Sequence, residues 1–72
     1  MSNQINPRKL LHSKWTSCHI EHKRKHFIVV EVEFDEQNKV EYCEIEAVID
    51  GFRREIDWRQ LKDSQQWRLG WK

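Results

Sequence analysis

The stretch HFIVVEVEF, residues 26–34, decides the fold class, because its side chains alternate as those of a β-strand do. One parity is entirely apolar, and we predict that it faces the core: Ile28, Val30, Val32 and Phe34. The other parity changes from apolar to acidic along the strand: Phe27, Val29, Glu31 and Glu33. The pattern therefore indicates a half-buried strand in an antiparallel sheet.

The next strand, predicted at 39–49, changes phase along its length. Val40 and Tyr42 share one parity, whereas the apolar residues that follow take the other: Cys43, Ile45, Ala47 and Ile49. One extra residue near Tyr42 and Cys43, a β-bulge, would bring them all to one face. With this bulge, the predicted cross-strand pairs are Phe34 with Val40, Val32 with Tyr42, Val30 with Ile45, and Ile28 with Ala47.

Asp50 and Gly51 predict a two-residue type I′ turn into a strand at 52–57. That turn pairs Ile49 with Phe52 and Ile45 with Ile56, and the predicted buried face comprises Ile28, Val30, Ile45, Ala47, Ile49, Phe52 and Ile56. The opposite face sets Glu46 against Glu55 and Glu44 against Asp57, an unfavourable arrangement that needs neutralising. An apolar corner on the same face, Phe27, Val29 and Val48, requires a cover from the two tryptophan-bearing ends.

The remaining elements are shorter. We expect a strand near 15–20 and helical turns near 7–12, 58–62 and 64–69, with Asn6 and Asp57 as N-caps and Gly70 closing the last turn. The predicted fold is a single domain, residues 1–72, of mainly β (small α+β) class. It is a curled antiparallel meander of three to four strands, with closure into a barrel as an alternative.

Four tryptophans in 72 residues dominate the composition. A chain this short buries only about 60% of its unfolded surface, so each buried ring carries a large share of the stability. We predict that Trp15 and Trp58 are core residues. The sequence leaves open whether Trp67 and Trp71 are structural or face a ligand.

The net charge of +1 conceals a segregation of charge along the chain. Residues 1–26 hold six basic side chains, one acid and all four histidines; residues 27–50 hold eight acids and Lys39; residues 51–72 hold six bases and three acids. Basic ends that fold back on the acidic middle would cancel most of the long-range field.

Several function classes find no support in the residues. No apolar run is long enough to cross a membrane, and two cysteines are too few for a disulfide framework, which favours a cytoplasmic location. Cys18, His22 and His26 have a spacing that suits a metal site on a helix, but the segment is predicted as strand and loop. With only Gly51 and Gly70, no phosphate loop exists. We expect no metal, no cofactor and no enzyme activity.

Short motifs along the chain are shared with a known family: NPRKLL at 6–11, SKWT at 13–16, KHF at 25–27, IEAV at 45–48, DWRQLKD at 57–63 and WRLGWK at 67–72. In these the chain resembles the small bacterial proteins known as tryptophan-rich conserved hypothetical proteins. The resemblance implies a bacterial, stand-alone protein. It brings no assigned activity, cofactor or catalytic residue.

The function predicted is that of a non-enzymatic module that binds or regulates another protein, whose identity and oligomeric state stay open. The alternative is RNA or single-stranded nucleic-acid binding through the basic loop 22–26 and neighbouring arginines and tryptophans. The candidate binding surface is Lys23, Arg24, Lys25, Arg53, Arg54, Arg68, Trp67 and Trp71. Trp67 and Trp71 beside residues 23–25 would favour nucleic acid, whereas a position over Phe27 and Val48 would favour a structural role.

Overall fold

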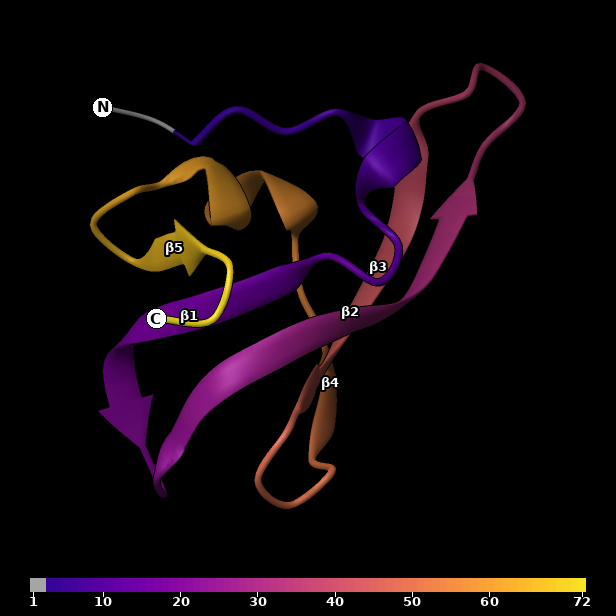
Figure 1. Ribbon diagram of the computed structural model, residues 1–72. Coiled ribbons are helices and arrows are strands. Elements are labelled where there is room, and N and C mark those ends of the chain that lie inside the picture. The colour runs from indigo at the N-terminus through magenta and orange to yellow at the C-terminus, as the bar shows by residue number, and fades with distance from the viewer. Residues whose placement is uncertain (1–2) are drawn as a thin grey trace.

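The computed structural model describes residues 3–72 as one antiparallel sheet in the order β4-β3-β2-β1-β5 (Figure 1). The strands are β1 (Lys14–Glu21), β2 (Arg24–Phe34), β3 (Val40–Ala47), β4 (Arg53–Glu55) and β5 (Trp67–Leu69), with single 3-10 turns η1 (Pro7–Lys9) and η2 (Trp58–Lys62). The predicted mainly β meander is confirmed for β1 to β4. A fifth strand joins β1, and the sheet stays open with β4 and β5 at its edges, so closure into a barrel is wrong.

Strand β5 occupies a segment that was predicted to be helical, 64–69. Its partner is β1, with Ser17 opposite Trp67. Asp63 does cap a turn by accepting the Gln65 N–H at 2.9 Å, but the turn does not continue into a helix. An isolated helix of so few residues is marginal, whereas pairing with β1 places Trp67 edge-on against Phe27, with ring centroids 5.3 Å apart. The prediction at 64–69 is therefore wrong because a distant contact overrides the local signal.

The buried parity of β2 is the reverse of the predicted one over its first half. Phe27 and Val29 are buried, while Ile28 and Val30 are only half-buried. Val30 is an extra residue in the ladder with β3, a bulge that returns Val32 to the core side. Trp15 and Trp67 contact Phe27 as predicted, but Val48, the third member of the predicted apolar corner, is exposed and has no such cover.

Strand β3 needs no bulge between Tyr42 and Cys43, because its ladder with β2 runs unbroken through both residues. The irregularity lies one residue earlier, at Glu41. Of the predicted pairs in this hairpin, only Phe34 with Val40 is confirmed. The three wrong pairs are corrected to Val32 with Cys43, Val29 with Ile45, and Phe27 with Ala47.

The connection from β3 to β4 is longer than the predicted two-residue turn. Strand β3 ends at Ala47, residues 48–51 form the loop, and Gly51 supplies a left-handed φ of 75°. The register moves by two positions, so the predicted pairs Ile49 with Phe52 and Ile45 with Ile56 are wrong, and Ile49 and Phe52 are exposed. The actual register replaces a carboxylate opposite Glu46 with Arg53, which avoids one like-charge pair.

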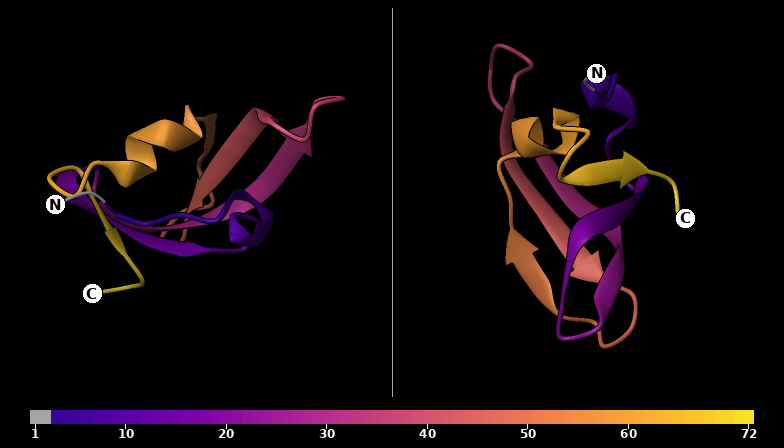
Figure 2. Two further views of the ribbon diagram at one scale, coloured as in Figure 1. Left: turned by 90° about the horizontal axis from the view of Figure 1, so that it is seen from above. Right: turned by 90° about the vertical axis from the view of Figure 1, so that its left-hand side faces the viewer.

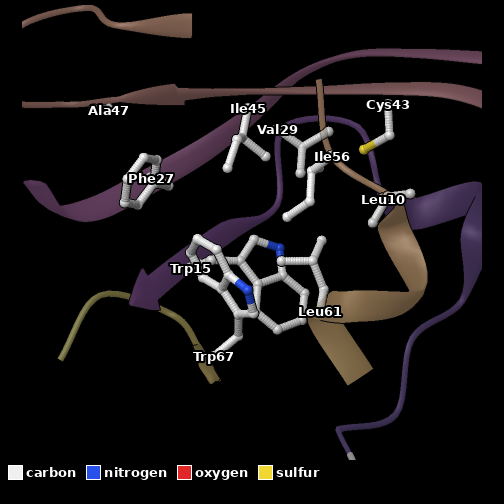
Figure 3. Packing of buried hydrophobic residues seen from close by; sticks show 10 residues of the cluster. All are labelled: Leu10, Trp15, Phe27, Val29, Cys43, Ile45, Ala47, Ile56, Leu61 and Trp67. Carbon is white, nitrogen blue, oxygen red and sulfur yellow. The ribbon is translucent and has the colours of Figure 1, made fainter. Parts of the chain in front are cut away.

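The core lies between the sheet and η2, which covers one face of the curled strands (Figures 2 and 3). Its side chains come from every strand except β4, from η2 and from the connecting segments. They are Leu10, Trp15, Phe27, Val29, Cys43, Ile45, Ala47, Ile56, Leu61 and Trp67. Trp15 is 1% exposed, as predicted for a core residue. Trp58 is half-buried and packs against the margin of this cluster.

Both helical turns begin at the predicted caps, and η2 has the predicted bounds, 58–62. The Asn6 side chain accepts the Arg8 N–H at 3.0 Å at the start of η1, and Asp57 accepts the Arg59 N–H at 3.1 Å at the start of η2. The turn predicted at 7–12 spans only Pro7–Lys9. Within residues 3–72, no helix is long and apolar enough to cross a membrane.

Candidate functional site

A groove of about 320 Å³ opens on the concave face of the sheet, between the β1–β2 hairpin and β4. We call it the mouth groove. Its aromatic members are Phe27, Phe52 and Trp67, and its polar members are Ser17, His19, Glu21, His22, Arg24 and Arg54. The volume lies at the lower end of the range typical of ligand pockets. It is the place where chemically varied side chains from four strands converge.

The floor of the mouth groove is aromatic. Phe27 and Trp67 are 6% and 5% exposed and pack edge to face, so they form a fixed base. Phe52 is 43% exposed at the rim. A ligand in the groove would therefore reach the Phe52 ring most readily.

The two arginines of the groove differ in their partners. The Arg24 Nε donates to Asp50 Oδ2 at 2.9 Å, and its guanidinium lies 4.0 Å from the Phe52 ring centroid. The Phe52 N–H, and then Arg24, hold the pKa of Asp50 below its usual value, so this pair is charged and matched at neutral pH. Arg54 stands opposite Ile45, on the concave side, and no hydrogen bond or ion pair joins its side chain to another residue within 3–72. Arg54 is thus the unmatched cation of the groove.

The facing wall is the β1–β2 hairpin. His22 and Lys23 form its turn with φ of 53° and 62°, a left-handed conformation that non-glycine residues adopt at a cost. This geometry sends Glu21 into register with Arg24 and brings His19 and His22 to the groove. The Ser17 hydroxyl is already engaged, donating to the His19 carbonyl at 2.8 Å and accepting the His19 N–H at 3.1 Å. Ser17 therefore has a structural role in the hairpin.

The predicted binding surface is only partly brought together. Arg24, Arg54 and Trp67 meet at the mouth groove. The other members lie elsewhere: Lys23 and Lys25 are exposed near the hairpin end, Arg53 is on the outer face against Glu46, Arg68 pairs with Thr16, and Trp71 packs beside His26. Sequence reasoning missed His19 and His22 as groove residues, and it placed Phe52 in the core.

Trp71 lies on the outer face and fastens the end of the chain to the hairpin. Its Nε1 donates to the Phe27 carbonyl at 3.0 Å, and its ring stacks against His26 at 5.9 Å between centroids. The Lys14 ammonium lies 4.8 Å from its ring centroid. These contacts, with Trp67 on Phe27, favour the structural role for both tryptophans.

The outer face carries the acidic residues. Glu44 stands opposite Glu31 on one side and Glu55 on the other. The Tyr42 hydroxyl donates to Glu44 Oε2 at 2.6 Å, and this bond, followed by burial and the nearby carboxylates, raises the pKa of Tyr42 to about 12. Arg53 reaches Glu46 at 2.7 Å and Glu44 at 3.9 Å. Arg53 therefore neutralises part of this face, while Glu31 and Glu55 have no ion pair within residues 3–72.

Reactive and metal-ligating chemistry is sparse in the part of the chain that the structure describes. Among residues 3–72, no three side chains of His, Cys, Asp or Glu are grouped so as to hold a metal ion. Burial, and then the charge of Asp57, raises the pKa of the Cys43 thiol to about 11, so it is protonated at neutral pH. Cys18 is a free thiol on the exposed part of β1.

The described residues thus form a small, curled, open antiparallel sheet with a cationic and aromatic groove on its concave face. Residues 13–72 match the family model described as "Tryptophan-rich protein (DUF2389)", and the chain belongs to this family. No match was found to a curated protein or to a solved structure. The family resemblance in the motifs is therefore confirmed.

Proposed function

We propose that this protein is a non-enzymatic binding module that takes up part of another protein in the mouth groove. The observation that carries the proposal is Arg54, an unmatched cation on the concave face beside the accessible Phe52 ring. A charged group next to an exposed aromatic ring supplies both specificity and apolar contact area.

A protein partner is favoured over nucleic acid by the position of Trp67, the tryptophan of the mouth groove. Base stacking needs accessible rings, and Trp67 is 5% exposed with its ring packed against Phe27. The acidic outer face adds repulsion for phosphates on the same small domain. Nucleic-acid binding through loop 22–26 stays the alternative, supported by the exposure of Lys23 and Lys25.

The proposal also includes that the protein has no enzyme activity. The Cys43 thiol is held protonated, and the Ser17 hydroxyl is committed to the backbone of His19, so neither is activated as a nucleophile. We also propose a cytoplasmic location in a bacterial cell, where Cys18 and Cys43 would stay reduced.

Affinity capture from cell extract treated with nuclease tests this function. The baits are the wild-type protein, Arg54→Glu, and Arg8→Glu, which makes the same charge change at an exposed position within η1, remote from the groove. We expect a protein retained by the wild type and by Arg8→Glu and lost with Arg54→Glu. Capture that is insensitive to Arg54, or that disappears with nuclease, would contradict the proposal.

A further inference from the structure

Strand β4 has a free edge next to the mouth groove. Within residues 3–72 its only ladder partner is β3, and it ends the strand order of the sheet (Figures 1 and 2). The flanking bonds, Ala47 N–H to the Phe52 carbonyl and Ile56 N–H to the Cys43 carbonyl, both at 2.8 to 2.9 Å, fix the phase of this ladder. Because bonded and non-bonded pairs alternate, Arg54 bonds to Ile45 and the backbone groups of Arg53 and Glu55 point away from the sheet.

The side chains of β4 determine which strand this edge would accept. Arg54 points to the concave face, and a residue placed opposite it on a new strand would form a non-hydrogen-bonded pair, with Cα atoms about 4.5 Å apart. This is the pair type with the closest side chains, so an acidic residue there would meet the guanidinium directly. On either side of Arg54, on the same face, lie the exposed Phe52 ring and the buried Ile56.

We infer that the mouth groove is filled by an extended segment of a partner protein that adds to β4 as a sixth, antiparallel strand, with a carboxylate opposite Arg54 and apolar side chains two positions to either side. The inference rests on the proposed function and specifies its mode of binding. The partner's backbone bonds to Arg53 and Glu55, and its concave-side residues enter the groove.

Charge complementarity selects this occupant. A second copy of the chain, pairing symmetrically through β4 about Arg54, would set Arg54 against Arg54 and leave both groove guanidinium groups without a counter-charge. The charged residues at 53–55 also discourage pairing with an arbitrary strand, since charged edges oppose unspecific strand addition. An acidic residue of the partner strand opposite Arg54 would instead be attracted to the guanidinium group.

Synthetic heptapeptides test the mode of binding by NMR titration of isotope-labelled protein. The probe is acetyl-Thr-Val-Thr-Glu-Thr-Val-Thr-amide, and the control peptides carry Gln or Lys at the centre. Two further peptides are methylated on backbone nitrogen, one at the two threonines beside the glutamate and one at the glutamate. In the added strand, only the threonine N–H groups face β4.

We expect the Glu peptide to bind with shifts centred on β4, to slow exchange of the Arg53 and Glu55 amides, and to bind about two- to fivefold more tightly than the Gln peptide. Methylation of the two threonines should abolish binding, whereas methylation of the glutamate should not. Arg54→Glu should reverse the preference in favour of the Lys peptide, and Arg8→Glu should leave it unchanged. No binding, shifts that map elsewhere, indifference to the site of methylation, or an unreversed preference would each overturn the inference.

Failure of this mode is distinguishable from failure of the proposed function. A natural partner that depends on Arg54 but leaves the exchange of the Arg53 and Glu55 amides unchanged would preserve the binding function and refute strand addition. A natural partner that ignores Arg54 would refute both.

Discussion

The two faces of the sheet differ in whether their arginine side chains form ion pairs. On the outer face, Arg53 contacts Glu44 and Glu46, and the Tyr42 hydroxyl bonds to Glu44, so these two carboxylates have partners within the domain. On the concave face, Arg24 is matched by Asp50, but Arg54, the next residue after Arg53, is left without a partner within residues 3–72. The two neighbouring arginines thus differ: Arg53 neutralises Glu44 and Glu46, whereas Arg54 has no ion pair within residues 3–72.

The largest expected effect is on the free energy of unfolding, and it distinguishes Trp15, in the core on the concave side, from Trp71, on the outer face. Trp15→Ala should lower the free energy of unfolding by about 3 to 5 kcal/mol, because it removes a ring that is 1% exposed. Trp71→Ala should cost about 1 kcal/mol, since that ring is 43% exposed and makes one hydrogen bond. Denaturant unfolding measures both, and a Trp71→Ala cost equal to that of Trp15→Ala would break the distinction.

A smaller effect is the change of stability with pH, which reports on Tyr42 on the outer face. The folded state holds the Tyr42 proton with a pKa of about 12, whereas the unfolded chain releases it near 10. Below pH 10 the tyrosine is protonated in both states, and above it the unfolded chain binds fewer protons, so stability falls as pH rises toward 12.

Tyr42→Phe should remove this part of the alkaline loss of stability and keep the part due to Cys43, whose pKa is also raised. Phenolate absorbance follows the titration directly, since Tyr42 is the single tyrosine of the chain. A midpoint near 10 in the folded protein would mean that the bond to Glu44 does not persist in solution.

The smallest effect compares the neighbouring arginines. Arg53→Ala should lower the denaturant midpoint slightly, because Glu44 and Glu46 lose their counter-charge while facing other carboxylates. Arg54→Ala should leave the midpoint unchanged, because Arg54 has no partner to lose. If both variants lowered the midpoint equally, Arg54 would have a structural role that the geometry does not give it.

Strands β1 to β4 were predictable, but β5 and most of the registers were not. Alternation in 26–34 and 39–49 locates β2 and β3 because side chains of a strand repeat every two residues. The buried parity of β2 depends on Trp67, which lies 40 positions after Phe27 and contacts it only in the fold. A contact at that separation leaves no local signal in the sequence.

The site was predictable to a similar extent. Arg24, Arg54 and Trp67 were expected on a binding surface and meet at the groove. His19 and His22 were missed because the hairpin turn uses His22 and Lys23 at positive φ, where glycine or asparagine is the usual signal. Phe52 was misplaced because the loop 48–51 is longer than an Asp-Gly turn predicts.

Residue-resolved hydrogen exchange of the free protein tests the central claim, that β4 presents an open edge beside the mouth groove. The Arg54 amide, which bonds to Ile45, and the Ile56 amide, which donates to the Cys43 carbonyl at 2.9 Å, should be protected. The Arg53 and Glu55 amides, which point away from the sheet, should exchange fast. Protection of all four amides would mean that the edge is covered in the free protein, and would contradict the account.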